Sequence, residues 1–133
     1  MLCPCSSGKS YQLCCKKYHE GVFAENALSL MKSRYSAYAL GYASYIIETT
    51  HPQSSQYKKN KKNWEQEIEL FSKNTVFHKL EIIEFIDGEQ KAFVTFKAHL
   101  SQNGADVSFT EKSLFEKYQG RWLYKEGIFL KNS

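Results

Sequence analysis

The four cysteines of this chain are crowded into its first 15 residues, in the segment CPCSSGKSYQLCC. A disulfide between the adjacent Cys14 and Cys15 would be strained, and Pro4 restricts the backbone between Cys3 and Cys5. Pairing all four thiols as disulfides is therefore unfavourable. Two short clips, CxC and CC, can instead surround one zinc ion, which takes four thiolates in a tetrahedron with bonds of about 2.3 Å. The spacing thus predicts a metal ion that folds a segment too short to have a core of its own.

The predicted zinc ligands are Cys3, Cys5, Cys14 and Cys15. Gly8 permits a tight turn between the two clips, and the stretch SYQLCC can form a helical turn that presents the second clip. His19 is the alternative fourth ligand, because a CxxxH step from Cys15 is chemically reasonable. Four protein ligands leave no coordination position for water, so the zinc is expected to be structural, and no catalytic residue is assigned to it.

Three lysines, Lys9, Lys16 and Lys17, lie beside the cysteines in the sequence. Four thiolates around Zn²⁺ carry a local charge of about −2, which these lysines can offset. The same three side chains are predicted to form a contact rim for a partner protein. The alternative is that they only solvate the module.

The segment CPCSSGKSYQLCC resembles the SEC-C motif, the small zinc module at the end of the bacterial preprotein translocase ATPase, whose usual form is CPCGSGKKYKxCC or ends in CH. Ser6 stands in place of the usual glycine, and Lys16 stands where a glycine commonly follows. Both departures affect the turn rather than the ligands. SEC-C modules are similar to sites that dock partner proteins, so the resemblance implies a protein-interaction adaptor.

The composition indicates a folded domain rather than a disordered chain. With 133 residues, of which 42% are hydrophobic and 15% aromatic, the chain can bury a core. Its net charge of +4 comes mainly from lysines spread along the chain and by itself indicates no partner. No apolar run is long enough for a membrane span or a secretory signal. We therefore expect a cytoplasmic protein with no membrane partner, in a reducing compartment where stable disulfides are disfavoured.

Helices are predicted in the first half of the chain. Apolar side chains recur at helical spacing over residues 25–42. A second, short helix should follow and end before Pro52, because a proline disfavours the helical region for the residue before it. Ser54 or Ser55 is predicted to cap a third helix, which should stop at Asn74.

The period of the apolar residues changes from helical to alternating after this point, which predicts strands. The four predicted strands cover residues 75–86, 89–100, 107–118 and 121–130. Asp87 with Gly88 is a strong signal for a two-residue hairpin turn, and Gln119 with Gly120 marks another turn. Three helices followed by four long antiparallel strands predict an α+β domain.

Strands this long usually curl, and a curled sheet closed by helices forms a cone with a hollow end. This pattern resembles the NTF2-like (cystatin-like) fold. The stretches LMKSRYSAYALG, THP and EKSLFEKYQGRWLYKEG further resemble the YchJ (UPF0225-type) family of bacterial proteins, in which a SEC-C motif precedes an NTF2-like domain. The resemblance covers essentially the whole chain and implies a SEC-C motif at residues 1–20 and an NTF2-like domain at residues 21–133.

The alternative function is a small-molecule binder or enzyme with its site in the cone. A hydrolase or isomerase would need a base positioned by a partner group, and no two of the four histidines stand at a telling spacing, so an enzyme is the less favoured class. The candidate lining residues of the cone are Tyr38, His51, His78, His99, Trp122 and Tyr124.

Two further interpretations concern charged residues. The stretch YKKNKKNW places four lysines between Tyr57 and Trp64, a pattern that can hold a single-stranded nucleic acid. On a helix, however, the aromatic residues fall on the buried face and the lysines on the solvated one, so nucleic acid is not favoured as a partner. Arg34 and Arg121 are predicted to form structural salt bridges with Glu111, Glu116 or Glu126. NTF2-like sheets often pair through an exposed face, so a homodimer is a further expectation.

Overall fold

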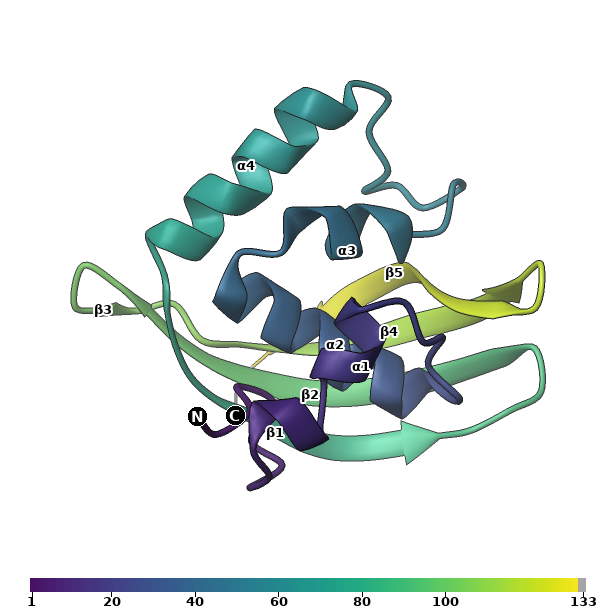
Figure 1. Cartoon of the computed structure of the whole chain (residues 1–133), viewed down its shortest axis with the longest axis horizontal. Helices are drawn as coiled ribbons and strands as arrows, with labels where there is room; N and C mark the ends of the chain where they lie inside the picture. The colour runs from purple at the N-terminus through teal and green to yellow at the C-terminus, as the bar shows by residue number, and fades with distance from the viewer. Residues whose placement is uncertain (132–133) are drawn as a thin grey trace.

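The computed structural model describes residues 1–131 as a curved antiparallel sheet with helices packed on one of its faces (Figure 1). The helical elements are η1 (Tyr11–Leu13), α1 (Lys16–His19), α2 (Ala27–Leu40), α3 (Ala43–Glu48) and α4 (Lys61–Lys73). The strands are β1 (Val76–Ile86), β2 (Lys91–Gln102), β3 (Ala105–Asp106), β4 (Phe109–Tyr118) and β5 (Arg121–Leu130). The long strands are ordered β1-β2-β4-β5, and β3 pairs only with β2.

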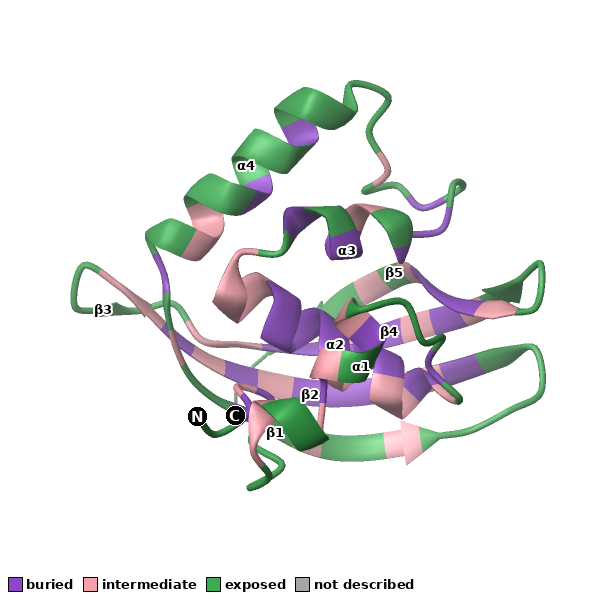
Figure 2. Cartoon of the chain, in the orientation of Figure 1, coloured by how far each residue is buried: buried purple, intermediate pink, exposed green. Residues whose placement is uncertain are grey.

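Helix α2 is the central helix of the fold, and most of its surface is buried (Figure 2). It begins after Asn26, whose side chain accepts a hydrogen bond of 2.8 Å from the Ser29 amide. It ends at Gly41, which adopts a left-handed φ of 77° that glycine tolerates at little cost. The short helix α3 follows at once, so the first two predicted helices are confirmed.

The predicted start of the third helix is wrong. Helix α4 begins after Asn60, whose side chain accepts a hydrogen bond from the Asn63 amide at 3.1 Å. Ser54 instead forms a turn, in which its amide donates to the His51 carbonyl at 2.9 Å and its Oγ accepts from the Gln56 amide. A residue engaged in this turn cannot cap a helix. The predicted stop at Asn74 is confirmed.

The sheet follows the predicted strands with two local differences. The β4–β5 hairpin turns on Gln119 and Gly120, which have φ values of 53° and 81°, as predicted for a tight turn. The β1–β2 connection is longer than two residues, because residues 87–90 lie between the strands. The third predicted strand starts two residues late, at Phe109, and the two residues of β3, which precede the predicted strand, pair with β2.

The core lies between the helices and one face of the sheet. Val94, Phe96, Ala98 and Leu100 alternate along β2, and all four are buried, as their spacing predicts. Segment 49–51 adds a short parallel contact to β5, where the His51 amide donates to the Tyr124 carbonyl and the Tyr124 amide donates to the Thr49 carbonyl. Within residues 1–131, no helix is both long and apolar enough to cross a membrane.

Candidate functional site

The sulfur atoms of the four cysteines converge at one point of the N-terminal segment. All four Sγ atoms lie within 4.8 Å of one another, with Cys5 and Cys14 at 3.5 Å and Cys14 and Cys15 at 4.0 Å. Sulfur atoms around a tetrahedral metal with bonds of about 2.3 Å are separated by about 3.8 Å. None of the four forms a disulfide. The cluster therefore has the ligand chemistry and the dimensions of a metal site.

The backbone of the segment brings the two clips together through a small hairpin followed by a helical turn. Leu2 pairs with Ser10, and the Cys3 amide donates to the Lys9 carbonyl at 2.9 Å. The chain then enters η1 and α1, and Cys15 occupies the position before the first residue of α1. Cys3, Cys5 and Cys15 are buried, and Cys14 is half-buried.

Hydrogen bonds between the thiols shift the pKa values of Cys5 and Cys15 in opposite directions. A hydrogen bond from the Cys15 thiol outweighs the opposing effect of burial and lowers the pKa of Cys5 to about 4. The same hydrogen bond, together with burial, raises the pKa of Cys15. One thiolate is thus stabilised by its neighbours, and the binding of a divalent ion must release the remaining protons.

His19, the alternative fourth ligand, uses both ring nitrogens elsewhere. Its Nε2 lies 2.8 Å from the Ser33 carbonyl oxygen, which can only accept, so Nε2 carries the proton. Its Nδ1 then accepts from the Tyr11 hydroxyl at 2.7 Å. The ring also packs edge-on against Tyr45 at 4.8 Å between centroids. His19 therefore connects the cysteine segment to α2 and α3 rather than to the sulfur cluster.

Two serines attach the cysteine segment to the rest of the protein. Ser36 of α2 has its Oγ 3.3 Å from the Cys15 sulfur and 3.4 Å from the Cys3 sulfur. Ser6 accepts a hydrogen bond of 3.0 Å from the Leu80 amide of β1, one of the two edge strands in the order β1-β2-β4-β5. Ser6 stands where the usual motif has glycine, and it holds a left-handed φ of 68° that costs a non-glycine residue about 1–2 kcal/mol. Its hydroxyl bond to the sheet edge offsets part of this cost.

The lysines predicted to form the contact rim lie on the outside of this segment. Lys9 and Lys17 are exposed, and Lys16 is half-buried as the first residue of α1. The Lys17 ammonium lies 5.1 Å from the centre of the Tyr18 ring.

A second feature is a cavity of about 550 Å³ between α2, α4 and the sheet. Aromatic side chains form most of its wall, and Tyr38 and Tyr124, which the sequence proposed as lining residues, both line it. Burial raises the pKa values of both phenols, and the Glu111 carboxylate adds to the effect at Tyr124. Both hydroxyls are therefore neutral over the physiological range.

The polar end of the cavity holds two charged residues that sequence reasoning assigned to salt bridges. Arg34 makes no ion pair among the described residues, and its Nη1 donates to the Ile46 carbonyl and to Thr49 and Thr50. Glu111 is buried and accepts from Ser113 and Tyr124. Arg121 pairs with Glu48 at 3.6 Å instead of a β4 or β5 glutamate. The alternating pattern of EKSLFEKY places Glu111 on the same face of β4 as Phe115, so the sequence contained a signal that the Glu111 side chain points toward the core.

The remaining predicted lining residues lie outside this cavity. His78 and His99 are on the outer side of the sheet, where His78 contacts Ser101 and His99 contacts Glu81. Trp122 is buried with the Lys117 ammonium 5.4 Å from its ring. His51 is buried, its Nδ1 accepts from the Gln53 amide, and its ring packs against Tyr118.

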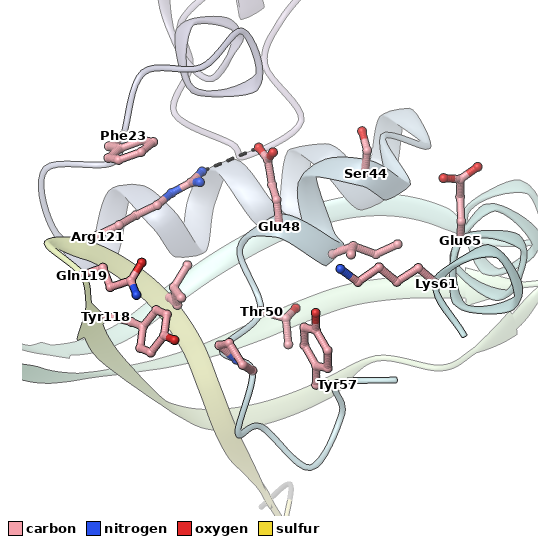
Figure 3. A pocket seen from close by; sticks show the side chains of 13 residues that line it. Phe23, Ser44, Glu48, Thr50, Tyr57, Lys61, Glu65, Tyr118, Gln119 and Arg121 are labelled. Atoms are coloured by element: carbon pink, nitrogen blue, oxygen red, sulfur yellow. Dashed lines mark ion pairs between the residues drawn. The ribbon is translucent and has the colours of Figure 1, made fainter. Parts of the chain in front are cut away.

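Tyr118 belongs to a different, open depression of about 500 Å³ next to α3 and the start of α4. Figure 3 shows Arg121 in this depression between Phe23 and Glu48. Arg121 forms an ion pair with Glu48. Lys61 and Tyr57 lie on the opposite side of the depression. Tyr57 packs against the buried Trp64, so of the two aromatic residues of the lysine-rich stretch only Tyr57, which is half-buried, keeps part of its surface open to the depression.

Comparison with known proteins agrees with this architecture. The family model for the middle NTF2-like domain of YchJ matches residues 26–127. Fold and site together define an NTF2-like domain preceded by a SEC-C cysteine segment. The chain belongs to the YchJ family.

Relatives cover nearly the whole chain. A UPF0225 protein of Vibrio vulnificus strain CMCP6 is 36% identical over 132 residues, which represent 96% of this chain and 74% of that protein. The solution structure of a SEC-C motif containing protein from Rhodopseudomonas palustris has a TM-score of 0.82 at 30% identity and covers 98% of this chain and 100% of that one. The crystal structure of a SEC-C motif containing protein from Psychrobacter arcticus has a TM-score of 0.78 at 27% identity, with coverages of 98% and 84%.

Proposed function

We propose that this protein is an adaptor whose N-terminal segment binds a structural zinc ion and docks a partner protein. The observation that carries the proposal is the convergence of four thiol sulfurs within 4.8 Å. Soft thiolate ligands in a tetrahedral arrangement favour zinc over the hard cations magnesium and calcium. With four protein ligands the ion has no open position for substrate, so its role is to hold the segment in shape.

The exposed surface of the zinc segment supports a docking role. Leu2 and Leu13 have 71% and 80% of their surfaces exposed on this segment. Lys9 and Lys17 are exposed on the same segment. Apolar anchors beside basic side chains suit a partner segment that carries apolar and acidic residues, because the charges complement each other.

The NTF2-like domain supplies the fixed base for this surface. The contacts of Ser36, Ser6 and His19 join the zinc segment to α2 and β1. A partner bound to the segment would therefore be held in a defined orientation relative to the domain.

Metal content per chain tests the zinc site. We expect one zinc per chain in protein purified without chelator, and its loss in Cys14→Ser. His19→Gln is the matched control, because both nitrogens of His19 bond to other groups, and it should retain one zinc. No metal in the reduced wild-type protein would refute the zinc site, and loss of zinc from both variants would return His19 to the ligand set.

Partner capture tests the docking role separately. The double variant Lys16→Glu with Lys17→Glu should reduce capture of acidic partner proteins from a bacterial lysate while it keeps its zinc. Lys61→Glu with Lys62→Glu makes the same charge change on α4 and should leave capture intact. Equal capture by the two double variants would show that the zinc segment is not the docking surface.

A further inference from the structure

Glu111, which lines the cone cavity, is buried and uses only one carboxylate oxygen in hydrogen bonds to described residues. Only 7% of the Glu111 surface is exposed. Its Oε2 accepts from the Ser113 hydroxyl and, at 3.4 Å, from the Tyr124 hydroxyl. Its Oε1 makes no hydrogen bond to any residue within 1–131, and no lysine or arginine there pairs with it. Oε1 is not enclosed by protein atoms and is open to the cavity, so a ligand that donates a hydrogen bond can reach it there.

The position of this carboxylate depends on a space kept free by Gly127. A Cβ atom built on Gly127 would lie 2.2 Å from Oε2 of Glu111 and 2.4 Å from its Cδ. Gly127 of β5 pairs with Ser113 of β4, whose hydroxyl donates to Glu111. The space beside Gly127 therefore faces the strand that carries both Ser113 and Glu111. The absence of a side chain at Gly127 thus leaves room for the Glu111 carboxylate, and any other residue type at position 127 would displace it.

The charge at this end of the cavity is balanced. The Arg34 guanidinium lies 4.8 Å from the centre of the Tyr124 ring, and the hydroxyl of that ring donates to Glu111. At the entrance, Lys58 pairs with Glu67. A cationic ligand would be repelled by Arg34, and an anionic one by Glu111. A neutral ligand avoids both penalties in this largely apolar space.

The wall of the cavity favours a ring compound. Phe71 and Phe77 pack edge to face at 5.9 Å between centroids, and Phe109 does so with Phe96 at 6.0 Å and with Phe129 at 5.4 Å. Flat aromatic ligands make the same edge-to-face contacts with such walls. A volume of about 550 Å³ lies within the range of small-molecule sites.

We propose that the cone cavity binds a neutral, mainly apolar ring compound whose hydroxyl or N–H group donates a hydrogen bond to Oε1 of Glu111. The Tyr124 hydroxyl already donates to Glu111 and accepts from Gln56 at 3.2 Å, whereas Oε1 of Glu111 makes no hydrogen bond to a described residue, so Oε1 is the acceptor that we assign. The proposal concerns a different site from the zinc segment and does not depend on partner docking.

Titration of the full, zinc-loaded chain with three naphthalene compounds tests the ligand class. We expect 2-naphthol to bind at least tenfold more tightly than naphthalene, which has no donor, and more tightly than the anion 2-naphthoate. Nuclear Overhauser contacts from the naphthol ring to the side chains of Ala98 and Leu100 should place it in the cavity. Equal affinity for naphthol and naphthalene, tightest binding of naphthoate, or contacts only outside the cavity would overturn the proposal.

A pair of variants tests the role of the carboxylate. Glu111→Gln removes the charge with little change of shape, and it should weaken 2-naphthol binding roughly tenfold while naphthalene binding stays unchanged. Glu126→Gln is the matched control, because Glu126 is exposed on the adjacent strand. Unchanged naphthol affinity in Glu111→Gln would overturn the assignment. If Glu111→Gln does not fold, the comparison of the three naphthalene compounds on the wild-type chain still tests whether the cavity prefers a neutral hydrogen-bond donor.

Discussion

The Ser36 hydroxyl donates a hydrogen bond to the Cys15 sulfur across 3.3 Å, from the central helix α2 to the cysteine cluster. Ser36 is fully buried, and its Oγ also lies 3.4 Å from the Cys3 sulfur. Residues that hydrogen-bond to metal ligands fix their orientation, and their loss weakens metal binding by about 10–100-fold. Ser36→Ala should therefore raise the zinc dissociation constant roughly tenfold, as measured by competition with a chelator.

Ser72→Ala is the control for this variant. The Ser72 Oγ is also buried, but it lies on α4 and has no hydrogen-bond partner among the described residues. Its removal should leave zinc affinity unchanged. The same zinc affinity in both variants would mean that Ser36 does not support the cluster.

The hydrogen bond from the Leu80 amide to Ser6 gives a second expectation. Because β1 is an edge strand, this amide has no strand partner on its outer side, and Ser6 protects it. In Ser6→Ala and Ser6→Gly, exchange of the Leu80 amide hydrogen should become about tenfold faster. Alanine must still hold the left-handed backbone, so Ser6→Ala should be less stable than Ser6→Gly by about 1 kcal/mol. Leu80 exchange at the wild-type rate in both variants would contradict the contact.

Features set by local spacing could be predicted from the sequence. The cluster of Cys3, Cys5, Cys14 and Cys15 follows from the clip spacing. The helix end at Gly41 and the turn at Gln119 and Gly120 follow from backbone conformations that few residues adopt. The buried face of β2 follows from the alternation of its apolar side chains.

Features that depend on distant contacts could not be predicted in this way. Ser54 and Asn60 both suit a helix cap, and the turn that engages Ser54 is fixed by the contact of His51 with β5. The role of His19 depends on a carbonyl 14 residues away. The sequence predicts a salt bridge of Glu111 with Arg34 or Arg121, and only the folded sheet places Glu111 in the cavity beside Gly127.

Because His19 is neutral in the folded chain, we expect the free energy of unfolding to depend on pH. Burial lowers the pKa of His19, and the bond to the Ser33 carbonyl opposes this effect only in part. The unfolded chain therefore binds a proton near the ordinary pKa of about 6.5, while the folded chain does not. The stability from this residue is present above that pKa and is lost as the pH falls through the folded pKa.

Denaturant unfolding between pH 7.5 and pH 5.5 measures this dependence. The wild-type free energy of unfolding should fall more steeply toward acid than that of His19→Gln, which has no group that titrates there. Thiol protonation affects both proteins equally, so the difference between the two slopes isolates His19. Parallel slopes would show that His19 is equally protonated in the folded and unfolded chains.

The close approach of Gly127 and Glu111 gives the last expectation. Gly127→Ala would place a Cβ atom 2.2 Å from the Glu111 carboxylate and force that side chain away from Ser113 and Tyr124. Overpacking of this kind should lower the free energy of unfolding by about 2 kcal/mol, measured by denaturant unfolding. Combining it with Glu111→Ala removes the clash, so the double variant should be at least about 1 kcal/mol more stable than the sum of the single effects implies. Strict additivity would show that the glycine does not make room for the carboxylate.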